Sequence, residues 1–156
     1  MRTRGFTLIE LVITVAIVGL LATAAFPLAE MAARRTKEQE LRLTLREIRD
    51  ALDAYKAAFD GGRIIQEVAQ SGYPPDLDMR AEGVEDAQDP EGARIYFLRR
   101  LPRDPFFPDA TARASKTWGL RSYESPPDDP QPGEDVFDVY SLSPGTGLNG
   151  VKYRDW

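Results

Sequence analysis

The chain has 156 residues, enough for one ordinary domain or for a smaller domain with a membrane segment. Histidine and cysteine are both absent, which excludes Ser/His/Asp and Cys/His nucleophile systems, thiolate metal sites and disulfide frameworks. The net charge of −5 divides unevenly, because four arginines face two glutamates up to residue 35 and the remainder carries −7. We expect no nucleic-acid binding, since an acidic soluble part repels the phosphate backbone.

The most informative segment is a predominantly apolar run over residues 6–28, which only Glu10 interrupts with a charge. As a helix this run would be roughly 35 Å long, enough to cross the hydrocarbon core of a bilayer. Three interpretations compete: a secretory signal cut near the small residues 22–24, a plain membrane anchor, and a leader of which only MRTRG is removed. A carboxylate within hydrocarbon is costly and needs a partner, so Glu10 favours the third interpretation.

The stretch GFTLIELVITVAIVGLLATAAFP resembles the prepilin leader and N-terminal helix of type IV pilins and pseudopilins. The resemblance implies that a membrane prepilin peptidase cuts between Gly5 and Phe6 and methylates the new amine of Phe6. It also implies that this amine pairs with Glu10 of a neighbouring subunit, because each charge would otherwise lie unpaired in an apolar filament core. Pro27 stands where this family commonly bends its helix, and we expect a kink or local melting over residues 23–27.

An amphipathic pattern continues the predicted helix beyond the apolar run. Apolar side chains recur at alternating spacings of four and three, which predicts one buried stripe. The members of this stripe are Leu41, Leu45, Ile48, Leu52, Tyr55 and Phe59. Gly61 and Gly62 follow as a stop signal, so one helix is predicted from Phe6 to about Asp60. We expect the stripe to pack on a sheet of the same chain, with a coiled-coil partner as the alternative.

Beyond residue 61 the chain is rich in proline and turn residues, which separate three strand candidates at residues 94–98, 117–123 and 135–142. One long helix beside these strands predicts an α+β, pilin-like fold, in which the helix packs on a small antiparallel sheet of about three strands. Asp104 in PRDPF is assigned to a turn, because no base or nucleophile is recognisable nearby.

The predicted organisation has four parts. They are a leader (residues 1–5), a transmembrane and assembly helix (6–28), the amphipathic second half of that helix (29–60) and a loop-rich β domain (61–156).

Further stretches are similar to the major pseudopilin of type II secretion systems: YPPDL, LRRLPRDPF, TWGLRSY, DVFDVYSLSPGTGLNG and the tail YRDW. That family often holds calcium in the loop after its last strand, with carbonyl oxygens and a pair of aspartates. Here Asp155 is the only side-chain carboxylate after Asp138, whereas calcium prefers six to eight oxygens with several carboxylates. We therefore expect no cofactor, with Asp155 as a weak calcium candidate, and we expect Tyr153 and Trp156 to hold the tail by packing.

The resemblance implies a structural subunit of a periplasmic pseudopilus in type II secretion, and not an enzyme. It places the chain in the bacterial inner membrane as a single pass, with a cytoplasmic N-terminus and a periplasmic C-terminal domain. The implied partners are further copies in a helical filament, minor pseudopilins, prepilin peptidase, an assembly platform with its ATPase, and membrane lipid. The alternatives are a pilin of a surface type IV pilus, used for adhesion, motility or DNA uptake, and a membrane-anchored periplasmic enzyme or binding module.

Overall fold

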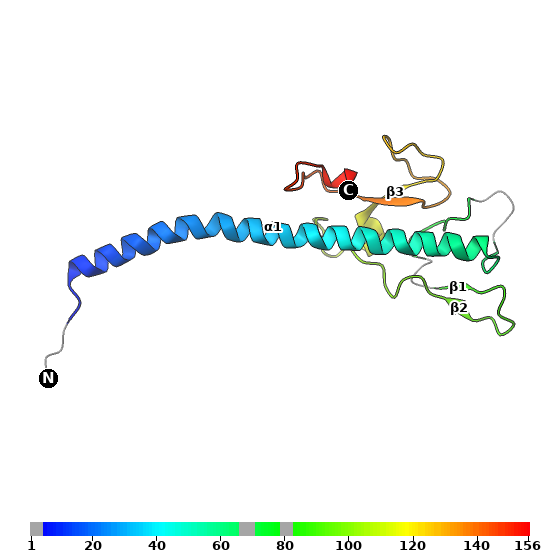
Figure 1. Cartoon of the computed structure of the whole chain (residues 1–156), viewed down its shortest axis with the longest axis horizontal. Coiled ribbons are helices and arrows are strands. Elements are labelled where there is room, and N and C mark those ends of the chain that lie inside the picture. The colour runs from blue at the N-terminus through cyan, green and yellow to red at the C-terminus, as the bar shows by residue number, and fades with distance from the viewer. Residues whose placement is uncertain (1–4, 66–70, 79–82) are drawn as a thin grey trace. The chain divides into compact units, whose positions relative to one another are not determined.

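A computed structural model describes residues 5–65, 71–78 and 83–156 of the chain. These residues belong to two units, an N-terminal unit (Met1–Lys37) and a C-terminal unit (Glu38–Trp156). Helix α1 (Leu8–Asp60) runs through the boundary between the two units (Figure 1). The prediction of one long helix ending at about Asp60 is confirmed, and the helix begins at Leu8 instead of Phe6.

The C-terminal end of α1 is fixed by backbone hydrogen bonds around Gly62. The Gly62 N–H donates to the Phe59 carbonyl at 2.8 Å, and the Arg63 N–H donates to the Ala58 carbonyl at 2.9 Å. This pair of bonds is the Schellman motif, which places a residue with positive φ just after the helix. Gly62 has a φ of 71°, so the glycine pair acts as the predicted stop signal.

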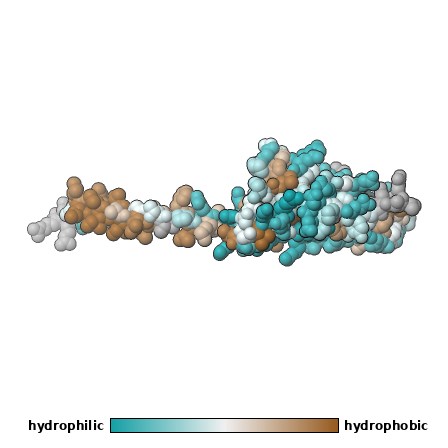
Figure 2. Space-filling view, turned by 90° about the horizontal axis from the view of Figure 1, so that it is seen from above, coloured by the Kyte–Doolittle hydropathy of each residue, from teal (hydrophilic) through white to brown (hydrophobic). Residues whose placement is uncertain are grey.

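In the N-terminal unit, α1 leaves its apolar side chains exposed. Leu8 is 81% exposed, while Val15 and Leu21 are each 64% exposed. Figure 2 shows these hydrophobic side chains gathered along the N-terminal part of the helix. Within the described part of the chain, α1 is the one helix long and apolar enough to cross a membrane.

The C-terminal unit contains four short strands in two antiparallel pairs, counted over the described residues. Strand β1 (Val84–Glu85) pairs with β2 (Arg94–Ile95), and β3 (Trp118–Arg121) pairs with β4 (Asp138–Ser141). The α+β class is confirmed, whereas the prediction of one sheet of about three strands is wrong.

The error has a physical origin in the segment that separates β2 from β3. Within the predicted strand at residues 94–98, only Arg94 and Ile95 form a strand, β2. This strand pairs with β1, which was not predicted from the sequence. Between β2 and β3 the chain passes Pro102, Pro105 and Pro108 and a short 3₁₀ helix, η1 (Ala114–Thr117). Proline cannot donate a ladder hydrogen bond, so this segment cannot extend either strand.

In the C-terminal unit the apolar stripe of α1 forms most of the core. Four stripe residues, none more than 2% exposed, share one cluster with the sheet β3–β4 and the tail. The residues of that cluster are Leu41, Leu45, Ile48, Leu52, Leu77, Trp118, Val136, Val139 and Tyr153. Tyr55 belongs to a second cluster, where its ring lies 5.3 Å from that of Phe97, and the partly buried Phe59 packs against the same cluster.

A close approach between strands shapes the sheet β3–β4. Gly119 on β3 lies directly opposite Tyr140 on β4. A Cβ atom at Gly119 would lie only 2.2 Å from the Tyr140 ring. The ring therefore occupies the space above β3 that any side chain at this position would need.

Candidate processing and assembly site

The predicted cleavage site lies where the described residues begin. Gly5 and Phe6 precede α1 and both are exposed, with Phe6 at 86%. A Cβ atom at Gly5 would meet no other atom within 4 Å, so no described part of the chain crowds this position. Residues 1–4 of the predicted leader lie outside the described residues.

Glu10 and Thr7 form a capping box at the start of α1. The Thr7 N–H donates to Glu10 Oε2 at 3.0 Å, and the Thr7 hydroxyl donates to the same oxygen at 2.9 Å. The Glu10 N–H donates in return to Thr7 Oγ1 at 3.3 Å. These bonds hold the carboxylate in the first turn, beside the positive end of the helix macrodipole. An amine released at Phe6 would add a second positive charge one residue before the cap.

Polar side chains in the apolar stretch of α1 are satisfied by the helix itself. The Thr14 hydroxyl donates to the Leu11 carbonyl at 2.9 Å, and the Thr23 hydroxyl donates to the Leu20 carbonyl at 2.7 Å. Such internal bonds remove the need for water, which a hydrocarbon environment does not supply.

Pro27 lies inside α1, and the helix is continuous through it. Local melting over residues 23–27 is therefore absent from this structure. A proline still removes one helical hydrogen bond and crowds the preceding turn, so the bend at Pro27 stays a prediction.

A buried carboxylate holds the C-terminal segment on α1 within the C-terminal unit. Glu38 is 4% exposed, and its Oε1 accepts the Tyr153 hydroxyl at 2.9 Å and the Leu148 N–H at 2.9 Å. Tyr153 also stacks on Phe106 with ring centroids 4.2 Å apart and meets the Trp156 ring edge-on at 5.0 Å. The tail is thus held by aromatic packing and by two hydrogen bonds to one carboxylate.

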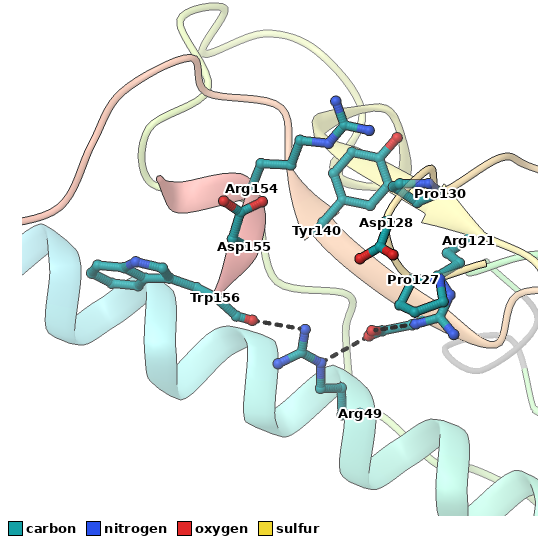
Figure 3. Close-up of a pocket in the computed structure, with 10 residues that line it drawn as sticks. Arg49, Arg121, Pro127, Asp128, Pro130, Tyr140, Arg154, Asp155 and Trp156 are labelled. Carbon is teal, nitrogen blue, oxygen red and sulfur yellow. Dashed lines mark hydrogen bonds and ion pairs between the residues drawn. The ribbon is translucent and has the colours of Figure 1, made fainter. Parts of the chain in front are cut away.

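Arg49 ties strand β4 and the last residue to α1 (Figure 3). Its Nε donates to Asp138 Oδ1 at 2.8 Å, and its Nη2 donates to the carbonyls of Val139 at 3.3 Å and Trp156 at 3.0 Å. One guanidinium therefore satisfies three oxygens from two separate segments of the chain, because its donors point in several directions.

The calcium candidate Asp155 lines a cavity of about 430 Å³ together with Asp128 and Asp138. Three guanidiniums, those of Arg49, Arg121 and Arg154, line the same cavity, and the first already bonds Asp138. Among the described residues there is no group of three or more His, Cys, Asp or Glu side chains that could hold a metal ion. This set of residues does not fit a calcium ion, which prefers several carboxylates without competing cations.

Asp104 makes the contacts of a turn residue. The buried Asp104 accepts the Phe106 N–H at Oδ1 (2.7 Å) and the Ser141 hydroxyl at Oδ2 (2.5 Å), and its own N–H donates to the Thr117 hydroxyl. These bonds join the turn to β4 and to η1.

Three of these roles were not predicted from the sequence. The TLIE pattern at residues 7–10 has the spacing of a capping box, so the partnership of Thr7 with Glu10 could have been found. Glu38 and Arg49 gave no such signal, because a charged residue on an amphipathic helix ordinarily faces solvent and their partners lie about a hundred residues away.

The similarity of this chain to known proteins lies at its N-terminus. Residues 1–26 match the prokaryotic N-terminal methylation motif. No curated protein and no solved structure gives a significant match to the chain. The matched stretch includes Gly5, Phe6 and Glu10 and stops just before Pro27. The chain therefore begins with a type IV pilin-like prepilin leader, joined to a helix that is long and apolar enough to cross a membrane.

Proposed function

We infer that this chain is a structural subunit of a periplasmic pseudopilus that supports protein export by type II secretion. Prepilin peptidase would remove the leader between Gly5 and Phe6 and methylate the amine of Phe6. The processed subunit would wait in the inner membrane, with its N-terminus in the cytoplasm and its C-terminal unit in the periplasm. An assembly platform with its ATPase would then extract it into a filament with further copies and minor pseudopilins.

The observation that carries this proposal is a carboxylate held in the first turn of a membrane-length apolar helix. Glu10 is capped by Thr7 and lies four residues after Phe6, inside the matched methylation motif. A carboxylate among apolar helices needs a counter-charge, and the amine of Phe6 in an adjacent copy supplies one. The exposed apolar side chains around Glu10 supply the surface along which helices of adjacent copies would pack.

Two features favour a pseudopilus over a surface type IV pilus. The chain has no cysteine, whereas many pilus-forming pilins close their C-terminal region with a disulfide. The second is the resemblance of several C-terminal stretches, among them residues 117–123 and 135–150, to the major pseudopilin pattern described under Sequence analysis. The methylation motif itself is shared by both kinds of filament.

The test of assembly is Glu10→Gln in the full chain, expressed in its native host. We expect the leader to be removed as before, while the amount of protein recovered in filaments falls strongly, because the counter-charge of the Phe6 amine is lost. Glu30→Gln is the matched control, since Glu30 is an exposed glutamate of the same helix outside the apolar run. Normal filament yield from Glu10→Gln would contradict the pairing.

Deletion of the chain's gene separates the two kinds of filament. A pseudopilus subunit should be needed for the release of folded proteins into the medium. Loss of long surface fibres in electron micrographs, with protein release unchanged, would instead identify a surface pilin.

A further inference from the structure

An arginine-rich groove runs along α1 within the C-terminal unit. The groove has a volume of about 520 Å³, and Arg42, Arg46 and Arg49 line it from successive turns, with Asp50 as the only acidic residue in its lining. The Trp156 ring forms another part of the lining, and the Arg42 guanidinium lies 4.2 Å from the centre of that ring. The lining of the groove thus holds three guanidinium groups and one carboxylate side chain, while Asp138 pairs with Arg49 from outside the lining.

In the part of the chain that the structure describes, no carboxylate pairs directly with two of the three guanidinium groups. Arg49 is committed to Asp138 and to two carbonyls. Arg42 stacks on Trp156, a contact that leaves its charge in place. Over the described part of the chain, no ion pair joins Arg42 or Arg46 to an acidic side chain, although both residues are exposed. The groove therefore presents two guanidinium groups that no carboxylate contacts directly in the described part of the chain, with Asp50 beside them in the lining.

The same unit presents an exposed loop of opposite charge at residues 123–135. The loop carries five acidic residues and no basic one. Three of its acidic residues, Glu124, Asp129 and Glu134, are exposed and do not line the cavity of Figure 3.

Internal hydrogen bonds hold this acidic loop in one shape. Ser125 Oγ donates to the Asp129 carbonyl at 3.2 Å and accepts the Gln131 N–H at 2.7 Å. The Tyr123 N–H donates to Asp135 Oδ1 at 2.9 Å, and the Ser122 N–H donates to the Gln131 carbonyl at 2.9 Å. Four prolines further restrict the backbone. A loop ordered in advance loses little conformational entropy when it binds.

We propose that the arginine-rich groove binds the acidic loop of a second copy of this chain. The contact joins two different surfaces, so it is heterologous, and its repetition gives an open helical filament when the rotation between copies does not close into a ring. Complementary charge also guides the approach of two copies and makes their contact sensitive to salt. The inference rests on the proposed function and gives the filament a second set of contacts, made by the C-terminal units.

The absence of cysteine allows a direct test in the full chain by disulfide cross-linking in the native host. A chain with both Arg46→Cys and Glu134→Cys should give a ladder of multimers on oxidation, because each copy would link to the next. Chains with one substitution each, expressed together, should link only as a mixed dimer. Lys116→Cys with Glu134→Cys is the matched control, since Lys116 is an exposed cation on η1.

The outcomes of this test are distinct from those that test the proposed function. A ladder from the groove pair and none from the control pair supports the contact. Filaments in micrographs without any ladder would overturn the contact while leaving the proposed function intact. Dimers formed by Arg46→Cys alone would also overturn it, because they indicate an isologous contact. Loss of Arg46→Cys reactivity toward a water-soluble maleimide, without cross-linking, would instead indicate that the groove faces lipid.

Discussion

Helix α1 lies in both units, and its apolar side chains are buried in the C-terminal unit and exposed in the N-terminal unit. In the C-terminal unit α1 buries its apolar stripe against β3, β4 and the tail, with Ile48 fully buried. In the N-terminal unit the large apolar side chains of the same helix range from 51% exposed at Met31 to 81% exposed at Leu8. The backbone is helical in both units, so helix formation and burial are separate properties of this chain.

The difference shows what each unit requires from its surroundings. A core of its own stabilises the C-terminal unit, whereas the apolar surface of the N-terminal unit calls for a bilayer or the helices of other copies. Substitutions in the two units should therefore have different consequences, with stability affected in one and assembly affected in the other.

The largest effect on stability should come from the buried stripe. Leu52→Ala should lower the free energy of unfolding of the C-terminal unit by about 2–5 kcal/mol, because it leaves a cavity in a closed core. Leu21→Ala makes the same change at a side chain that is 64% exposed, and it should alter that free energy by less than about 0.5 kcal/mol. Denaturation of the full chain in detergent, followed by the fluorescence of Trp118 and Trp156, measures both. Equal losses would break the distinction between the two units.

The contact between Glu38 and the tail should rank next. Tyr153→Phe removes the hydroxyl that donates a hydrogen bond to Glu38. The free energy of unfolding should fall by about 1.5–3 kcal/mol, the usual range for a hydrogen bond to a charged group. Tyr96→Phe, at a side chain that is 62% exposed, is the control and should leave stability unchanged. The same denaturation experiment measures both variants. A Tyr153→Phe variant as stable as the parent would show that packing alone holds the tail.

A glycine substitution sharpens the comparison further. Gly119→Ala should destabilise the C-terminal unit by about 1–3 kcal/mol, because its Cβ atom would overlap the Tyr140 ring. Gly19→Ala, in the N-terminal unit, meets no atom within 4 Å and should not destabilise the C-terminal unit. Thermal unfolding of the two variants by circular dichroism compares them, and a neutral Gly119→Ala would refute the predicted steric overlap.

The smallest effect concerns acid stability near the end of α1. The hydrogen bond from the Arg63 guanidinium, and secondarily that from the Gln88 N–H, hold the pKa of Asp86 below its usual range. The stabilisation is present above the unfolded pKa, about 3.9, and is lost as the pH falls through the lower pKa of the folded state. Asp86→Asn should therefore flatten the loss of stability below about pH 4. Asp53→Asn, an exposed carboxylate on α1, is the control, and identical pH profiles for Asp86→Asn and the parent would contradict this role.

Local signals predicted the helix well. The apolar run, the stripe with spacings of four and three, and the glycine pair all act between neighbouring residues, and they gave the extent of α1 closely. The buried stripe also follows from spacing, because apolar residues separated by three and four positions fall on one face of a helix and that face tends to be buried. The capping box of Thr7 with Glu10 is equally local and was available from the same four residues.

Pairing between distant segments could not be predicted in the same way. Strand candidates near β2, β3 and β4 were found, yet their division into two sheets depends on the path of the chain through the prolines between them. The role of Glu38 depends on Tyr153, 115 residues away, and nothing beside Glu38 in the sequence indicates that partner. Contacts of this kind become visible only once the fold has brought the segments together.

The most direct test of the account is the mass of the mature protein, purified from its native host. Cleavage between Gly5 and Phe6, followed by methylation, underlies both the pairing with Glu10 and the assembly of the N-terminal unit. Mass spectrometry should find a chain that begins at methylated Phe6. A chain that retains MRTRG, or one that begins at Ala25 after cleavage of an ordinary secretory signal, would contradict the account.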